Sequence, residues 1–93
     1  MRLSSEEISA IKSTIMKIDL EAKIYLFGSR VDDTQRGGDI DILIWSNKLT
    51  NEHKRKIRLN LYELLGEQKI DLVIAKDTSN PFVRIALSEG VPL

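Results

Sequence analysis

Three short apolar runs, the last two of them alternating, restrict the fold of this chain more than any other feature. They lie at residues 23–27 (KIYLF), 39–45 (DIDILIW) and 69–75 (KIDLVIA), and each has the length and pattern of a β-strand. Helical patterns precede, separate and follow these runs. The sequence therefore predicts an α/β or α+β fold in which helices flank a small, mixed three-stranded sheet.

Three segments have the apolar periodicity of amphipathic helices, at residues 5–18, 51–65 and 81–89. Ser4 and Glu7 form a capping box at the start of the first helix. Asn80 caps the third helix before a proline, which suits the first helical position. The buried face of the second helix is predicted to consist of Ile57, Leu61, Leu64 and Leu65. With 93 residues in total, the chain is expected to form a single domain over residues 1–93.

Charge and composition restrict the possible partners. The chain has 14 basic and 14 acidic residues, so its net charge gives no reason to expect nucleic acid or an anionic membrane as partner. It has no cysteine, which excludes disulfides and thiolate metal sites. No apolar run approaches the roughly 18–20 residues of a membrane span, and the N-terminus lacks the pattern of a signal peptide. A cytoplasmic protein is the expectation.

Two aspartates open the second predicted strand. Asp39 and Asp41 are two positions apart, so their side chains project from the same face of the strand. Asp71 has an equivalent place in the third strand, and it joins the same acidic face if the two strands are neighbours. Clustered carboxylates repel one another unless a cation compensates them, and Mg²⁺ prefers such oxygen ligands. The three aspartates are therefore candidate ligands for two Mg²⁺ ions.

A glycine turn directly follows the first predicted strand. Gly28 allows the backbone to approach a phosphate closely, and a short helical turn after it would direct its N–H groups at that phosphate. The Ser29 hydroxyl can donate to a β- or γ-phosphate oxygen, and Arg30 is a cation suited to the departing pyrophosphate. Arg36 is a second candidate cation in the loop. Gly28, Ser29 and Arg30 are thus candidate nucleotide-binding residues.

The turn and the acidic strand together resemble a known signature. The chain has FGSR at residues 27–30 and DIDILI at residues 39–44, with nine residues between Ser29 and Asp39. This pattern is similar to the signature of DNA polymerase β-type nucleotidyltransferases. With the KIDLVI strand and the closing FVRIALSEGVPL, the chain resembles the minimal nucleotidyltransferases encoded beside HEPN-domain proteins. The resemblance implies metal binding by Asp39 and Asp41, a third acid at Asp71, and phosphate contact by Ser29.

The resemblance also implies an activity and a partner. It implies Mg²⁺-dependent transfer of a nucleoside monophosphate, AMP from ATP being the first expectation, to a hydroxyl of a HEPN-type RNase toxin. The chain would then be the antitoxin in a hetero-oligomer. Two alternatives stay open: an antitoxin that neutralises its partner by contact, and a catalytic subunit acting on a small molecule or an RNA end. The family often has Gly and Ser where this chain has Asp33 and Gly38, which favours the contact antitoxin.

Other conspicuous residues have simpler interpretations. Trp45 is predicted to lie at the edge of the core, and His53 is predicted to be solvated. The basic residues between 54 and 58 spread around more than one helical face, so a solvated surface is favoured over an RNA-binding patch. Asp32 and Asp33 are interpreted as solvated loop residues.

Overall fold

The structure of the protein is a computed structural model that describes residues 3–31, 39–66 and 68–93. Its elements are α1 (Ser5–Met16), β1 (Lys23–Phe27), the short 3₁₀ helix η1 (Gly28–Val31), β2 (Ile40–Trp45), α2 (Asn51–Leu65), β3 (Ile70–Ala75), α3 (Pro81–Glu89) and β4 (Val91–Pro92). Within the described ranges, no helix is both long enough and apolar enough to cross a membrane.

The sheet has the strand order β3-β2-β1-β4 and is mixed. β1 is antiparallel to β2 and to β4, whereas β2 and β3 are parallel and connected through α2. The α+β class is confirmed, but the sheet has four strands where three were expected. β4 is a two-residue strand that contains a proline, so it has no periodicity by which a sequence pattern would reveal it.

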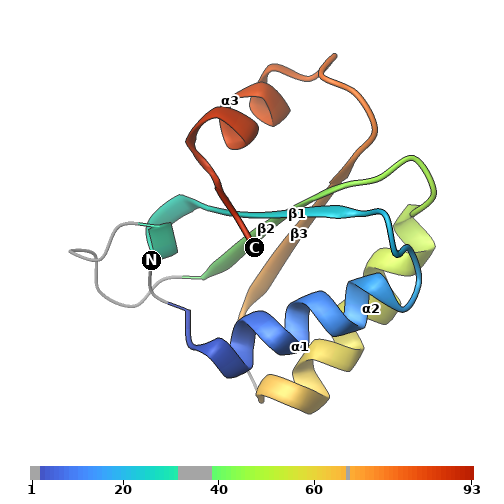
Figure 1. Cartoon of the computed structure of the whole chain (residues 1–93), viewed down its shortest axis with the longest axis vertical. Helices are drawn as coiled ribbons and strands as arrows, with labels where there is room; N and C mark the ends of the chain where they lie inside the picture. The colour runs from blue at the N-terminus through green and yellow to red at the C-terminus, as the bar shows by residue number, and fades with distance from the viewer. Residues whose placement is uncertain (1–2, 32–38, 67) are drawn as a thin grey trace.

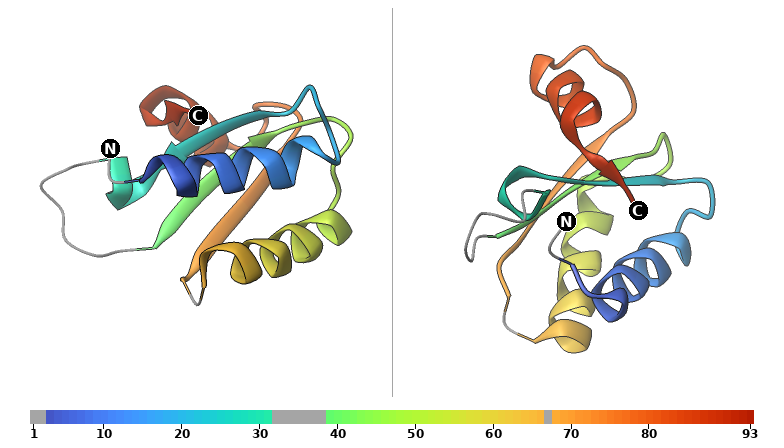
Figure 2. Two further views of the ribbon diagram at one scale, coloured as in Figure 1. Left: turned by 60° about the horizontal axis from the view of Figure 1, so that its bottom comes forward. Right: turned by 60° about the vertical axis from the view of Figure 1, so that its left-hand side comes forward.

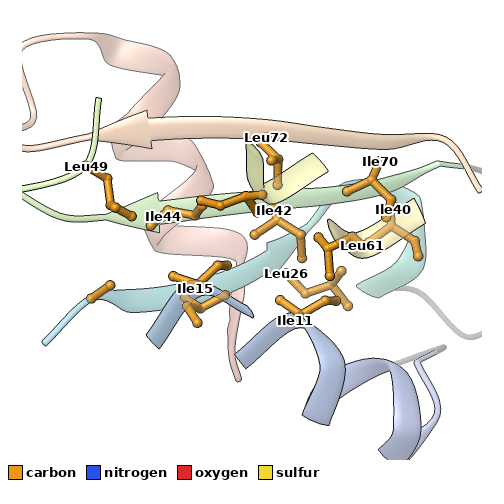
Figure 3. Close-up of a cluster of buried hydrophobic side chains, with 13 residues drawn as sticks. Ile11, Ile15, Leu26, Ile40, Ile42, Ile44, Leu49, Leu61, Ile70 and Leu72 are labelled. Carbon is orange, nitrogen blue, oxygen red and sulfur yellow. The ribbon is translucent and has the colours of Figure 1, made fainter. Parts of the chain in front are cut away.

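Helices cover both faces of the sheet and make three layers (Figures 1 and 2). α1 and α2 lie on one face, where they enclose the main core; Figure 3 shows the side chains of Ile11, Ile15 and Leu61 against those of the strands. α3 lies on the other face, where Val83 and Ala86 pack with Leu43 in a smaller cluster. Because side chains alternate along β2, its isoleucines face the main core and Asp41 faces the α3 side.

The predicted helix ends are largely confirmed. Ser4 and Glu7 form the capping box, with the Glu7 N–H donating to Ser4 Oγ at 3.1 Å. Asn80 Oδ1 accepts from the Phe82 N–H at 2.9 Å. α1 ends at Met16, two residues early, because the N–H groups of Ile18 and Asp19 both donate to the Ile15 carbonyl.

One prediction for the buried face of α2 is wrong. Leu64 is 60% exposed, since the buried stripe follows Ile57 and Leu61 and leaves Leu64 beyond its edge. His53 stays partly exposed, and its Nδ1 accepts from the Thr50 N–H at 3.0 Å. His53 therefore helps to start the helix. Trp45, in contrast, lies at the edge of the smaller cluster as expected.

A buried polar network fixes the end of the sheet where β2 finishes. Ser46 Oγ donates to Asp19 Oδ2 at 2.5 Å, and both residues are buried. The same Ser46 oxygen accepts from the N–H groups of Lys48 and Leu49, each at 3.1 Å. The network thus ties the segment after α1 to the turn that leads into α2.

Replacing Ser46 with alanine is expected to lower the free energy of unfolding by about 1–3 kcal/mol, because one oxygen of the buried Asp19 carboxyl group and two N–H groups lose their partner. Urea unfolding measures this loss. Ser79→Ala is the matched control, since Ser79 also donates to an aspartate, Asp77, at 2.7 Å but on the exposed surface. Equal losses in the two variants would contradict the assigned role of burial.

Candidate active site

Three chain segments meet at one edge of the sheet. β1 ends at Phe27, and because β2 is antiparallel to it, β2 begins at the same edge. β3 is parallel to β2 and therefore also begins there. The topology therefore brings the starts of β2 and β3 to the end of β1 (Figure 1). The Gly28 turn, the Asp39–Asp41 segment and Asp71 belong to these three places in the chain.

The register of β2 and β3 pairs the predicted acids directly. Asp41 and Asp71 are Cα partners across the two parallel strands. Both are half-buried, and both lie on the sheet face opposite the main core. The condition on which Asp71 was expected to join the site, adjacency of its strand to β2, is therefore met.

Asp39 lies immediately before β2 and has a cationic neighbour. Lys69 Nζ lies 3.4 Å from Asp39 Oδ2, and their side chains are 70% and 41% exposed, respectively. Since Ile40 and Ile70 are also register partners, Asp39 and Lys69 face each other one position before the two strands begin. Two cross-strand pairs thus follow one another: a carboxylate with an ammonium group, then a carboxylate with a carboxylate.

The glycine turn is pressed against the acidic pair. Gly28 has φ +76°, a conformation that other residues rarely adopt. A Cβ atom placed at Gly28 would lie 3.2 Å from Asp41 Cγ and would collide with its carboxylate oxygen Oδ2. Gly28 therefore serves both the turn and the approach of Asp41.

The electrostatics of the site reflect this crowding of acids. Partial burial, then the charges of Asp71 and Asp39 and a hydrogen bond with Asp71, raise the pKa of the Asp41 carboxyl above its ordinary value of 3.8. The hydrogen bond with Asp39, then its charge, raises the pKa of Lys69 above 10.5. The strand edge thus carries more negative charge than Lys69 balances.

An aromatic pair borders the acids on the β1 side. Phe27 is the register partner of Asp41, so the two side chains are neighbours on the same sheet face. The Phe82 ring from α3 meets the Phe27 ring edge to face, with centroids 5.5 Å apart, and Phe82 is 44% exposed. The site is therefore flanked by an apolar surface that is open to solvent.

Several predicted contacts lie outside the described residues. The backbone of Ser29 and Arg30 forms η1, the expected short helical turn, but their side chains are not described. Asp32, Asp33, Arg36 and Gly38 also lie outside the described ranges. The phosphate contacts expected of Ser29, Arg30 and Arg36 remain predictions.

Sequence reasoning missed Lys69. The signal that would have revealed it is the pattern Lys-x-Asp at residues 69–71, which repeats the spacing of Asp-x-Asp at residues 39–41. In a parallel register the two patterns align position by position, so a charge before the strand matters as much as a charge within it.

The donor set suits Mg²⁺. Asp39, Asp41 and Asp71 supply hard oxygen atoms from two adjacent strands, and the raised pKa of Asp41 marks negative charge that a divalent cation would relieve. In the described part of the chain no three acidic, histidine or cysteine side chains already converge into a closed metal cluster. Asp39 is instead paired with Lys69.

A small α+β domain with this acidic strand pair beside a glycine turn belongs to the class of nucleotidyl-transferring domains. The sequence matches the model of the family described as "Polymerase beta, Nucleotidyltransferase" over residues 6–93, and the chain belongs to that family. The transferase class expected from the sequence is thereby confirmed. No curated protein sequence matches the chain.

Proposed function

We propose that the protein transfers AMP from ATP to a hydroxyl group of a partner protein, a HEPN-type RNase toxin, and so acts as its antitoxin. The observation that carries the transfer is the register of Asp41 with Asp71 beside the Gly28 turn. The toxin as acceptor is supported by the resemblance to minimal nucleotidyltransferases encoded beside HEPN-domain proteins.

In the proposed reaction the acceptor oxygen forms a bond to the α-phosphorus of ATP, and the bond from that phosphorus to the bridging oxygen of the β-phosphate breaks. Pyrophosphate leaves with the bond electrons. Asp71, on the strand farther from the glycine turn, orients the acceptor hydroxyl and accepts its proton as the oxygen bonds to phosphorus. Asp39 and Asp41 would bind the metal ions that accompany the nucleotide. The η1 turn, with Ser29 and Arg30, holds the β- and γ-phosphates.

Asp39, Asp41 and Asp71 would hold two Mg²⁺ ions. When bound, these ions would neutralise charge on the phosphates. The protein's contribution is to keep three carboxylates on one rigid sheet edge, where strand pairing fixes their separation. The Asp41 side chain is further restricted by the backbone of Gly28 on its other flank.

The surface near the site supports a protein acceptor. Phe82 is half-exposed and packs against Phe27, the cross-strand neighbour of Asp41. Ile85, one turn further along α3, is 56% exposed. An apolar surface next to a reaction centre suits a protein partner that brings its hydroxyl in from solvent. A freely diffusing acceptor such as a sugar would not require this apolar surface.

Intact-mass analysis of the HEPN-domain protein tests the proposal. After incubation with this protein, ATP and Mg²⁺, the HEPN protein is expected to gain AMP, and Asp39→Asn is expected to abolish the gain. Asp77→Asn is the matched control, because Asp77 follows the far end of β3 and is exposed. Loss of AMP transfer in both variants would contradict a specific role for Asp39.

Two other results would redirect the proposal. A stable, inhibitory complex without added mass would identify an antitoxin that acts by contact. Transfer of AMP to a small molecule or an RNA end, but not to the HEPN protein, would keep the chemistry and replace the acceptor.

A further inference from the structure

The charge arrangement at the sheet edge is asymmetric in a way that the transfer chemistry does not require. Asp41 faces a carboxylate, Asp71, whereas Asp39 faces the ammonium group of Lys69 at 3.4 Å. One of the three proposed ligands is thus already neutralised by the chain itself. Any divalent cation that uses Asp39 has to compete with Lys69 for it.

The Lys69 side chain is free to give up this contact. It is 70% exposed, and ion pairs between exposed side chains contribute little to stability. Lys69 also lines an open depression together with Tyr62 and Glu63, on the side of β3 where α2 ends. The side chain therefore has space away from Asp39 and does not lock the site.

A divalent cation at Asp39 would repel Lys69, but a triphosphate beside that cation would attract it. The nucleotide brings several negative charges to the same strand edge, and ammonium groups pair readily with phosphate oxygens. The two ligands therefore have opposite effects on the lysine: the cation alone displaces it, while the cation with nucleotide gives it a new partner.

We propose that Lys69 is a positioning residue that couples metal binding to nucleotide binding, an inference that rests on the proposed function. Without nucleotide, Lys69 neutralises Asp39 and weakens binding of a divalent cation. With nucleotide, Lys69 transfers its contact from Asp39 to a phosphate oxygen. The acidic edge consequently binds metal and nucleotide together better than it binds metal alone.

Mn²⁺ binding by Lys69→Met tests this coupling without any turnover. The variant is expected to bind Mn²⁺ about three- to tenfold more tightly than the wild type in the absence of nucleotide, since a positive charge near the cation is gone. In the presence of Mn²⁺ it is expected to bind a non-hydrolysable ATP analogue more weakly by a similar factor. Electron paramagnetic resonance measures free Mn²⁺, and calorimetry measures analogue binding.

Two variants make the result specific. Lys76→Met removes the same charge from the other end of β3, about 20 Å away along the strand, and is expected to leave both affinities unchanged. Lys69→Arg keeps the charge and is expected to behave like the wild type. If Lys69→Met matches Lys76→Met in Mn²⁺ affinity, the coupling is refuted.

The experiment also separates this inference from the proposed function. A wild-type protein that binds Mn²⁺ with the ATP analogue, together with a silent Lys69→Met variant, refutes only the role of Lys69. A wild-type protein that binds neither Mn²⁺ nor the analogue refutes both.

Discussion

Replacing Asp41 with asparagine is expected to abolish nucleotidyl transfer and to raise slightly the thermal stability of the metal-free protein at neutral pH. The two effects have one cause. Burial and the charges of Asp71 and Asp39 raise the pKa of Asp41, so its ionised form is disfavoured in the folded state. A carboxylate kept there against this cost is useful for the site and unfavourable for the fold.

The pH dependence follows from the direction of the shift. A carboxyl group whose folded pKa is raised contributes stability below its unfolded pKa, near 3.8, and this contribution is lost as the pH rises through the folded value. Thermal unfolding at pH 7 is therefore expected to favour Asp41→Asn over the wild type. Near pH 3, where both side chains are neutral, the difference should vanish. The shift will be small because solvent screens this partly exposed group.

The loss of transfer is expected to be large. A ligand to a catalytic cation is worth several kcal/mol in the transition state, and about 4 kcal/mol corresponds to roughly a thousandfold in rate. Single-turnover transfer of labelled AMP to the acceptor measures this rate. Near-wild-type turnover by Asp41→Asn, alongside an unchanged Asp77→Asn control, would remove Asp41 from the proposed mechanism.

The sequence predicted the fold well where residues act locally. The short apolar run that ends at Gly28 placed β1 at its observed bounds, and Asn80 with Pro81 correctly predicted the start of α3. Apolar alternation also predicted that Asp41 and Asp71 face away from the main core. These features depend on neighbours along the chain, which a pattern records directly.

Features that depend on strand pairing were beyond the pattern. β4 is recognised only by its pairing with β1. The role of Lys69 depends on the strand register that places it opposite Asp39. Leu64 was misplaced because helical periodicity gives the centre of a buried stripe better than its edge. From the sequence, Asp71 could join Asp41 only if their strands were neighbours. The structure shows that β2 and β3 are paired.

Gly28→Ala is the second change with a large expected effect, and it tests the geometry of the site instead of its charge. Alanine at φ +76° costs about 1–2 kcal/mol in backbone strain. Its Cβ would in addition collide with the Asp41 carboxylate. We expect a loss of about 2–4 kcal/mol in the free energy of unfolding and a fall of at least a hundredfold in transfer, because Asp41 has to move.

Gly66→Ala separates strain from collision. Gly66 has φ +81°, and a Cβ atom there meets nothing within 4 Å. Both variants therefore place a side chain at a positive φ, where it is strained, and only Gly28→Ala disturbs an acid. Urea unfolding is expected to show a loss of about 1–3 kcal/mol for Gly66→Ala, from strain alone, with transfer unchanged. Equal transfer rates in the two variants would mean that the Gly28 turn does not set the position of Asp41, and that the strand alone is sufficient to hold it.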